Sequence, residues 1–132
     1  MRKLIAALVM LGMLACMFIP SVSFTEDKDT VLLARTIYAL GKGESYETKL
    51  ALGSVAMNRV GNPWYPDTLE EVLAEKHQFP AGQTYDDESL KAAHAVVTGQ
   101  TTLDAKLVQW SSSPIDAREC VQVGGLYLAT RN

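Results

Sequence analysis

Cysteine and histidine are scarce in this sequence, with two residues of each type among 132. Cys16 lies in the apolar segment at the start of the chain, so Cys120 is the only cysteine beyond it. A single cysteine can form neither an intramolecular disulfide framework nor a cysteine-based metal site, and we expect its side chain to be packed rather than reactive. His77 and His94 are far apart and lack a third ligand at a recognisable spacing. We therefore expect no metal site, and no motif indicates a cofactor.

Basic residues are also outnumbered, because 12 lysines and arginines stand against 15 aspartates and glutamates, a net charge of −3. Two of the basic residues, Arg2 and Lys3, open the chain, so the rest is more acidic than the whole. This balance argues against a nucleic-acid partner. The sequence also lacks internal repeats and low-complexity stretches, and its length suits one compact domain.

The first 23 residues have the three-part layout of a secretory signal peptide. Arg2 and Lys3 form a basic start, residues 4–19 form an apolar run, and a small-residue stretch follows at 21–23. The run is shorter than the roughly 20 apolar residues that span a hydrocarbon core, which disfavours a permanent anchor. We predict cleavage after Ser23, which leaves residues 24–132 as a single domain outside the cytoplasmic membrane.

Two alternatives would keep the protein in contact with the membrane. The segment could remain uncleaved, or Cys16 could be acylated, because residues 13–15 before it loosely match a lipobox. In the simpler interpretation Cys16 is one more apolar residue of the signal segment. Without either alternative, we expect a secreted or wall-associated protein.

Helices are predicted in the first part of the domain, where apolar residues recur at helical spacing. Asp29 or Thr30 can cap the first helix and Ser45 the second, and residues 68–71 form a capping box for the third. The predicted helices are 31–40, 46–60, 68–76, and a fourth that starts at Asp86 or Asp87 and ends before Gly99.

Strands are predicted in the last part, at residues 107–110, 121–123 and 126–128. Gly124 and Gly125 separate the last two strands, which is typical of a hairpin with a two-residue turn. The whole pattern predicts an α+β fold with a mainly helical body and a short C-terminal antiparallel sheet.

Several stretches of sequence, taken in order, carry a more specific signal. They are LLARTIYA at 32–39, GESYE at 43–47, GSVAMNRV at 53–60, NPWYPDTL at 62–69, HQF at 77–79, AAHAVVTG at 92–99 and VGG at 123–125. The ordered set resembles the SleB-type cell-wall hydrolase family, which includes spore cortex-lytic enzymes, and it spans nearly all of the chain after residue 31.

The resemblance implies a small lysozyme-related fold that acts on the glycan strands of peptidoglycan. It also implies non-hydrolytic cleavage of the linkage from muramic acid to glucosamine. Such cleavage needs a carboxylic acid that protonates the leaving oxygen and is kept protonated by a partly apolar surround. One acid can suffice when a hydroxyl of the sugar itself closes the product, as in lytic transglycosylases.

The chain departs from the family at the position of this acid. The family's usual pattern is Glu-Ala-Arg-Gly-Glu, whereas residues 40–44 here are LGKGE, so Leu40 replaces the first glutamate. Leucine has no proton to donate. Glu44 is retained at the second position and is the candidate catalytic acid, although it could instead bond free backbone N–H groups at the start of the next helix. Leu126 and Leu128 stand where the family usually has a histidine and an aromatic residue.

Four residues could still bind a glycan: Tyr38, Gln78, Phe79 and Trp110. Aromatic faces stack on the apolar faces of sugars, and an amide both donates to and accepts from hydroxyl groups. For Phe79 and Trp110 the alternative is packing in the core or in a loop.

Three hypotheses follow for the protein's function. It could be an enzyme that uses Glu44, a degenerate homologue that binds peptidoglycan or modulates an active partner, or a structural protein of the cell surface or spore coat. The first two differ in whether another carboxylate can reach the cleft, whose floor we expect Asn58 and Arg59 to brace. The other carboxylates to consider are Glu47, Asp86, Asp87 and Asp116.

Overall fold

The computed structural model describes residues 27–100 and 103–132. The predicted signal peptide, its cleavage site and Cys16 lie outside these ranges and stay predictions. Within the ranges, every helix is too short or too polar to cross a membrane.

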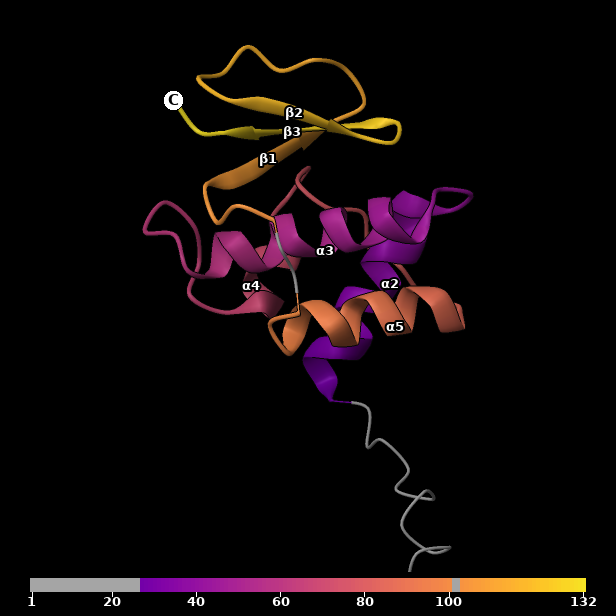
Figure 1. The fold of residues 1–132 in the computed structure, drawn as a ribbon. Helices are drawn as coiled ribbons and strands as arrows, with labels where there is room; N and C mark the ends of the chain where they lie inside the picture. The colour runs from indigo at the N-terminus through magenta and orange to yellow at the C-terminus, as the bar shows by residue number, and fades with distance from the viewer. Residues whose placement is uncertain (1–26, 101–102) are drawn as a thin grey trace, which may run out of the picture.

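The described part of the chain consists of helices followed by a sheet (Figure 1). The helices are α2 (Lys28–Gly41), α3 (Tyr46–Val60), α4 (Leu69–Ala74) and α5 (Asp87–Val97). The strands are β1 (Leu107–Ser111), β2 (Cys120–Val123) and β3 (Leu126–Thr130), which form an antiparallel sheet in the order β1-β3-β2. The predicted α+β layout, with a mainly helical body and a C-terminal sheet, is confirmed.

The first helix begins earlier than predicted. It starts at Lys28, so Asp29 and Thr30 lie inside its first turn instead of capping it. Asp27 takes the cap position, where its carbonyl accepts from the N–H of Val31 at 3.0 Å while its side chain makes no capping bond. Thr30 is buried against the helical body. Packing of this first turn therefore stabilises helix where the sequence pattern alone predicts a cap.

Two smaller expectations are also wrong. α4 ends at Ala74 rather than near residue 76, because Glu75 already has extended backbone angles. Cys120 is exposed rather than packed. It lies on β2, an outer strand of the sheet whose residues are mostly exposed.

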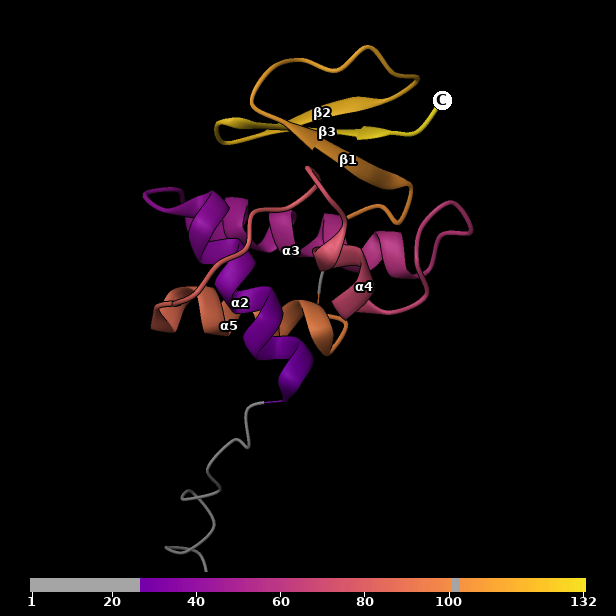
Figure 2. The ribbon, with the colours of Figure 1, turned by 180° about the vertical axis from the view of Figure 1, so that it is seen from behind.

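Helix α3 is the centre of the fold. It lies between the sheet on one side and α2 and α5 on the other, as Figure 2 shows from behind. A methyl group on Gly53 would stand 3.0 Å from the side chain of Ile37 and 3.1 Å from that of Val96, so the neighbouring helices pack closely on α3. The same core includes Leu33, Val55, Val72, Phe79, Ala92 and Leu128.

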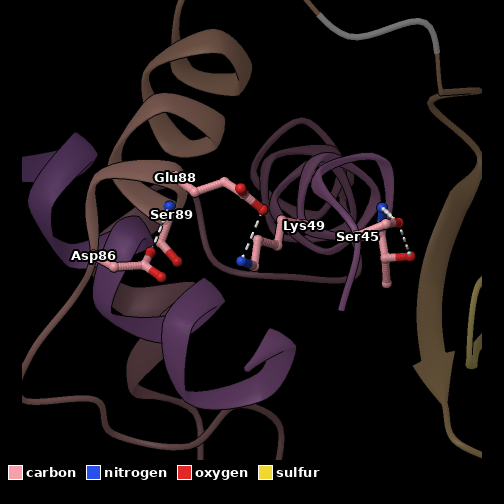
Figure 3. A network of polar contacts seen from close by, with 6 residues as sticks. Ser45, Lys49, Asp86, Glu88 and Ser89 are labelled. Atoms are coloured by element: carbon pink, nitrogen blue, oxygen red, sulfur yellow. Dashed lines mark hydrogen bonds and ion pairs between the residues drawn. The ribbon is translucent and has the colours of Figure 1, made fainter. Parts of the chain in front are cut away.

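Polar side chains form hydrogen bonds and an ion pair at the first turns of α3 and α5 (Figure 3). The predicted side-chain caps are confirmed at Ser45, Thr68 and Asp86. The Lys49 side chain is only 7% exposed, and its Nζ pairs with Oε1 of Glu88 at 2.9 Å. This pair joins α3 to the first turn of α5 and satisfies a lysine that the helical body largely encloses.

The loop between α4 and α5 is held against α2 at Gly82. A methyl group there would lie 2.6 Å from the carbonyl carbon of Arg35 and would overlap its oxygen. Because both atoms belong to helix backbone, the contact admits no side chain. It positions the loop that carries Gln78 and Phe79.

We predict that Gly82→Ala lowers the free energy of unfolding by about 1–3 kcal/mol, the usual effect of overpacking. Gly61→Ala is the matched control, because no atom lies within 4 Å of the added methyl group, and its effect should stay within about 0.5 kcal/mol. Chemical denaturation of both variants tests this. Equal stability of Gly82→Ala and the wild type would show that the loop is not held at this point.

The cap of α5 predicts a dependence of stability on pH. The Ser89 hydroxyl and backbone N–H lie beside the Asp86 carboxylate and lower its pKa. The N–H does so through a 2.8 Å hydrogen bond, whereas the hydroxyl oxygen has no partner in hydrogen-bond geometry within the described ranges. A carboxyl with a lowered folded pKa stabilises the fold above its unfolded pKa of about 4 and loses this contribution as pH falls through the folded value.

We therefore expect Asp86→Asn, which can still cap the helix, to be less stable than the wild type at pH 7 and to differ less from it at about pH 2, below the unfolded pKa. Asp116→Asn, in an exposed loop, is the control and should show no such convergence. Denaturation curves at the two pH values test this, and a constant difference would contradict it.

Candidate active site

A pocket of about 570 Å³ opens between the helical body and the sheet. Its walls come from the end of α3, the turn after it, the loop after α4, strand β1 and the residue after β3. The lining residues are Arg59, Tyr65, His77, Gln78, Gln109, Trp110, Ser111, Ser112 and Arg131. They supply guanidinium, amide, hydroxyl, imidazole and aromatic groups, and no carboxylate is among them.

Arg59 lies at the inner wall of this pocket and is 3% exposed. Its Nε donates to the carbonyl of Val108 at 2.7 Å, and its Nη1 donates to Oε1 of Gln78 at 3.1 Å. The guanidinium carbon lies 4.7 Å from the ring centre of Tyr65 and 4.9 Å from that of Phe79. One side chain on α3 thus contacts β1, the turn and the loop.

Burial and neighbouring groups shift the pKa of the Arg59 guanidinium. Burial lowers the pKa of its guanidinium, Tyr65 and Glu75 raise that pKa, and Arg131 lowers it. The group remains a cation at neutral pH, as arginine does in proteins. One oxygen of the Glu75 carboxylate is buried without a hydrogen-bond partner in the described ranges.

Asn58 supports the same strand from the preceding position of α3. Its Nδ2 donates to the carbonyls of Asp104 at 2.9 Å and Leu107 at 3.0 Å. Asn58 and Arg59 thus join the end of α3 to the start of β1. These contacts are of the kind expected of residues that support the floor of the cleft.

The structure brings together three of the four predicted glycan-binding residues. Gln78 and Trp110 line the pocket, and Trp110 Nε1 donates to the carbonyl of Gln78 at 3.2 Å. The rings of Phe79 and Trp110 stack with their centres 6.2 Å apart. Phe79 is buried in the core, so it supports Trp110 from behind. Tyr38 is not among the lining residues and contacts Lys42, whose Nζ lies 5.8 Å from its ring centre.

Glu44 lies away from this pocket, against the turn between β2 and β3. A methyl group on Gly125 would stand 2.9 Å from one carboxylate oxygen of Glu44, and one on Gly124 would stand 3.2 Å from the other. The carboxylate accepts no hydrogen bond within the described ranges, and Ser45 caps the helix that follows. Its side chain therefore makes neither of the contacts that the sequence suggested, a helix cap or a place in the pocket.

The three leucines that, by the resemblance, stand in place of a glutamate, a histidine and an aromatic residue are all packed. Leu40 is partly buried against the core, Leu126 is buried, and Leu128 is fully enclosed. The other carboxylates that the sequence proposed do not line the pocket: they are Glu47, Asp86, Asp87 and Asp116. Asp86 instead caps α5.

Sequence reasoning missed several lining residues, above all Tyr65 and Arg131. Tyr65 lies beside Pro66 in the turn after α3, and nothing in the sequence pattern distinguishes hydrophobic packing in that turn from a place in a pocket. Arg131 follows the last strand, far in sequence from the other residues, so only the fold brings it to the site. Within the described ranges, no group of three or more histidine, cysteine or acidic side chains could hold a metal ion.

The family model for cell wall hydrolases matches residues 43–114 of this chain. Among curated proteins, the spore cortex-lytic enzyme of Oceanobacillus iheyensis is 33% identical over 84 residues, which are 59% of this chain and 30% of that enzyme. The spore cortex-lytic enzyme of Bacillus subtilis is 34% identical over 75 residues, which are 54% of this chain and 25% of that enzyme. The matched region thus spans less than a third of these relatives.

Among solved structures, the catalytic domain of the germination-specific lytic transglycosylase SleB from Bacillus anthracis superposes with a TM-score of 0.67 at 18% identity. The superposition covers 83% of this chain and all of that domain. The catalytic domain of Bacillus cereus SleB gives a TM-score of 0.65 at 20% identity, covering 83% of this chain and 95% of that one. These likenesses confirm the lysozyme-related fold, and with the match of the family model they establish that the chain belongs to the SleB-type cell wall hydrolase family.

Proposed function

We propose that this protein binds the glycan strands of peptidoglycan and does not cleave them by the family's usual route. The observation that carries the proposal is the composition of its pocket, which presents sugar-binding groups without an acid. Trp110 offers an aromatic face, while Gln78, Gln109 and Ser111 offer amides and a hydroxyl. Such groups bind sugars through stacking and hydrogen bonds.

The missing acid is what separates binding from cleavage here. A leaving glycosidic oxygen must receive a proton, and general acid catalysis of this kind contributes roughly 10²–10⁴ to the rate. By resemblance, the acid position is Leu40, whose side chain packs against the core. A hydrocarbon at that point can line a surface but cannot transfer a proton.

Cleavage by Glu44 is the second candidate function. Its carboxylate is partly exposed, close to the Leu40 position along the chain, and held near the Gly124–Gly125 turn. The same contact argues against it, because the carboxylate faces the hairpin and lies outside the pocket that contains Gln78 and Trp110.

The location that we propose is outside the cytoplasmic membrane. The signal-peptide pattern of residues 1–23 supports export, and the relatives' description as spore cortex-lytic enzymes is consistent with a wall substrate. Residues 24–132 would then be the wall-binding domain. A member that binds without cutting could also modulate an active partner, whereas a purely structural coat protein would need no such pocket.

Incubation of the purified protein with peptidoglycan, followed by mass spectrometry of the soluble products, tests the proposal. We expect no anhydro-muropeptides from the wild type, which should nevertheless sediment with insoluble peptidoglycan. Leu40→Glu should restore the acid and release at least about a hundredfold more product than Leu40→Gln. The glutamine variant is the matched control, because it introduces the same bulk and polarity without an acid.

Release of product by the wild type would contradict the proposal. Loss of that release in Glu44→Gln would make Glu44 the acid, and loss in Glu75→Gln would assign the role to the carboxylate beside Arg59. Glu47→Gln, on the exposed start of α3, is the control for a change of charge alone. If the wild type neither sediments with peptidoglycan nor cuts it, the remaining hypothesis is a structural protein of the cell surface or spore coat.

A further inference from the structure

Two guanidinium groups meet at the pocket and share one aromatic ring. The guanidinium carbon of Arg131 lies 5.7 Å from the ring centre of Tyr65, and that of Arg59 lies 4.7 Å from it. Arg131 also covers Trp64, at 4.7 Å from its ring centre. Stacking on rings holds a guanidinium by its face and leaves the N–H groups at its edge free to donate.

Neither cation is neutralised by an ion pair. The salt bridges of the described ranges are Lys28 with Glu70 and Lys49 with Glu88, both remote from this pocket. Two donors of Arg59 are used, by Val108 and Gln78. The exposed side chain of Arg131 donates no hydrogen bond to any residue in 27–100 or 103–132, so its N–H groups face solvent.

The nearby carboxylates of Glu75 and Glu119 do not neutralise the two arginines. Glu75 influences Arg59 without reaching ion-pair distance. Glu119 borders an adjoining pocket that also includes Arg131 and Arg118, but it forms no ion pair with either arginine. A concentration of positive charge beside an acid-free pocket is unusual in a chain whose net charge is −3. The two cations repel each other, since Arg131 lowers the pKa of Arg59, and an anionic ligand would offset this repulsion.

We propose that Arg131 and Arg59 form a carboxylate subsite of the pocket, which binds the acidic substituent of a muramyl residue while the glycan lies along Trp110 and Gln78. This inference rests on the proposed function, because it assumes a peptidoglycan ligand. Carboxylates are the anions that the planar fork of arginine matches with two parallel hydrogen bonds. Two chemical sources carry this group, the stem peptide and the lactyl side chain of a muramyl residue without peptide.

Titration of the purified protein with soluble fragments, followed by NMR, tests the subsite. The probes are an N-acetylated disaccharide-tripeptide, the same compound with its carboxylates converted to methylamides, and the peptide-free disaccharide with its lactyl carboxylate. We expect the charged tripeptide form to bind roughly tenfold more tightly than the methylamide form, in line with a charge-assisted hydrogen bond. A preference for the charged tripeptide form over the methylamide form assigns the carboxylates of the stem peptide. Tight binding of the peptide-free probe without that preference assigns the lactyl carboxylate, which is an amide in both tripeptide forms.

Arg131→Gln should abolish the preference for the charged probe, so that its affinities for the charged and methylamide forms become equal. Arg118→Gln is the matched control, because it removes the same charge from an exposed residue that does not line the site, and it should keep the preference. Equal affinity of the wild type for charged and methylamide probes, together with no tighter binding of the peptide-free probe, would overturn the subsite and leave peptidoglycan binding intact. Failure of every probe and of sedimentation with peptidoglycan would instead overturn the proposed function.

Discussion

The arrangement of the pocket depends on the buried guanidinium of Arg59. Its hydrogen bonds reach a carbonyl of β1 and the side chain of Gln78, and its faces contact Tyr65 and Phe79. A buried charge is stable only where its donors are satisfied. Because these contacts hold the guanidinium of Arg59, strand β1, the turn after α3 and the loop after α4 all lie around it. The same three segments form walls of the pocket.

A second constraint acts at the opposite end of the sheet, where the hairpin approaches the start of α3. Gly124 has a φ of 58°, and the carboxylate of Glu44 lies so close to both glycines of the turn that side chains there would contact it. Glu44 and the Gly-Gly pair therefore fit each other as a packing contact between body and sheet. This contact offers a structural reason for a glutamate at this position, independent of any reaction.

The helices and strands were largely predictable from sequence, because each depends on local signals. The extent of α3 follows from Ser45 and Gly61, and the hairpin follows from the Gly-Gly pair. The start of α2 was not predictable, since burial of Thr30 belongs to the tertiary fold. The exposure of Cys120 depends in the same way on strand order, which places β2 at an edge.

The site was predictable only in part, for the same physical reason. Gln78 and Phe79 were found in a family motif and Trp110 through its aromatic ring, and the fold places them together. Tyr65 lies in the NPWYPDTL stretch, which does not mark it as a site residue, and Arg131 lies in no motif. Their common role arises from the meeting of a turn with the chain after the last strand. Long-range contacts of this kind leave no periodicity in the sequence.

Binding and cleavage place different demands on this fold, and they can be separated. Binding requires a shaped surface of rings and polar groups, which Arg59 supports through the packing of the whole domain. Cleavage adds one proton donor at one position, which by the resemblance is that of Leu40, and the Leu40 side chain packs with the core. Since the groups that shape the pocket also link α3 to the sheet and the loop, substitutions there weaken the fold itself, whereas leucine in place of an acid removes a carboxylate that would resist burial. On the function that we propose, the chemistry of such a domain is therefore easier to lose than its pocket.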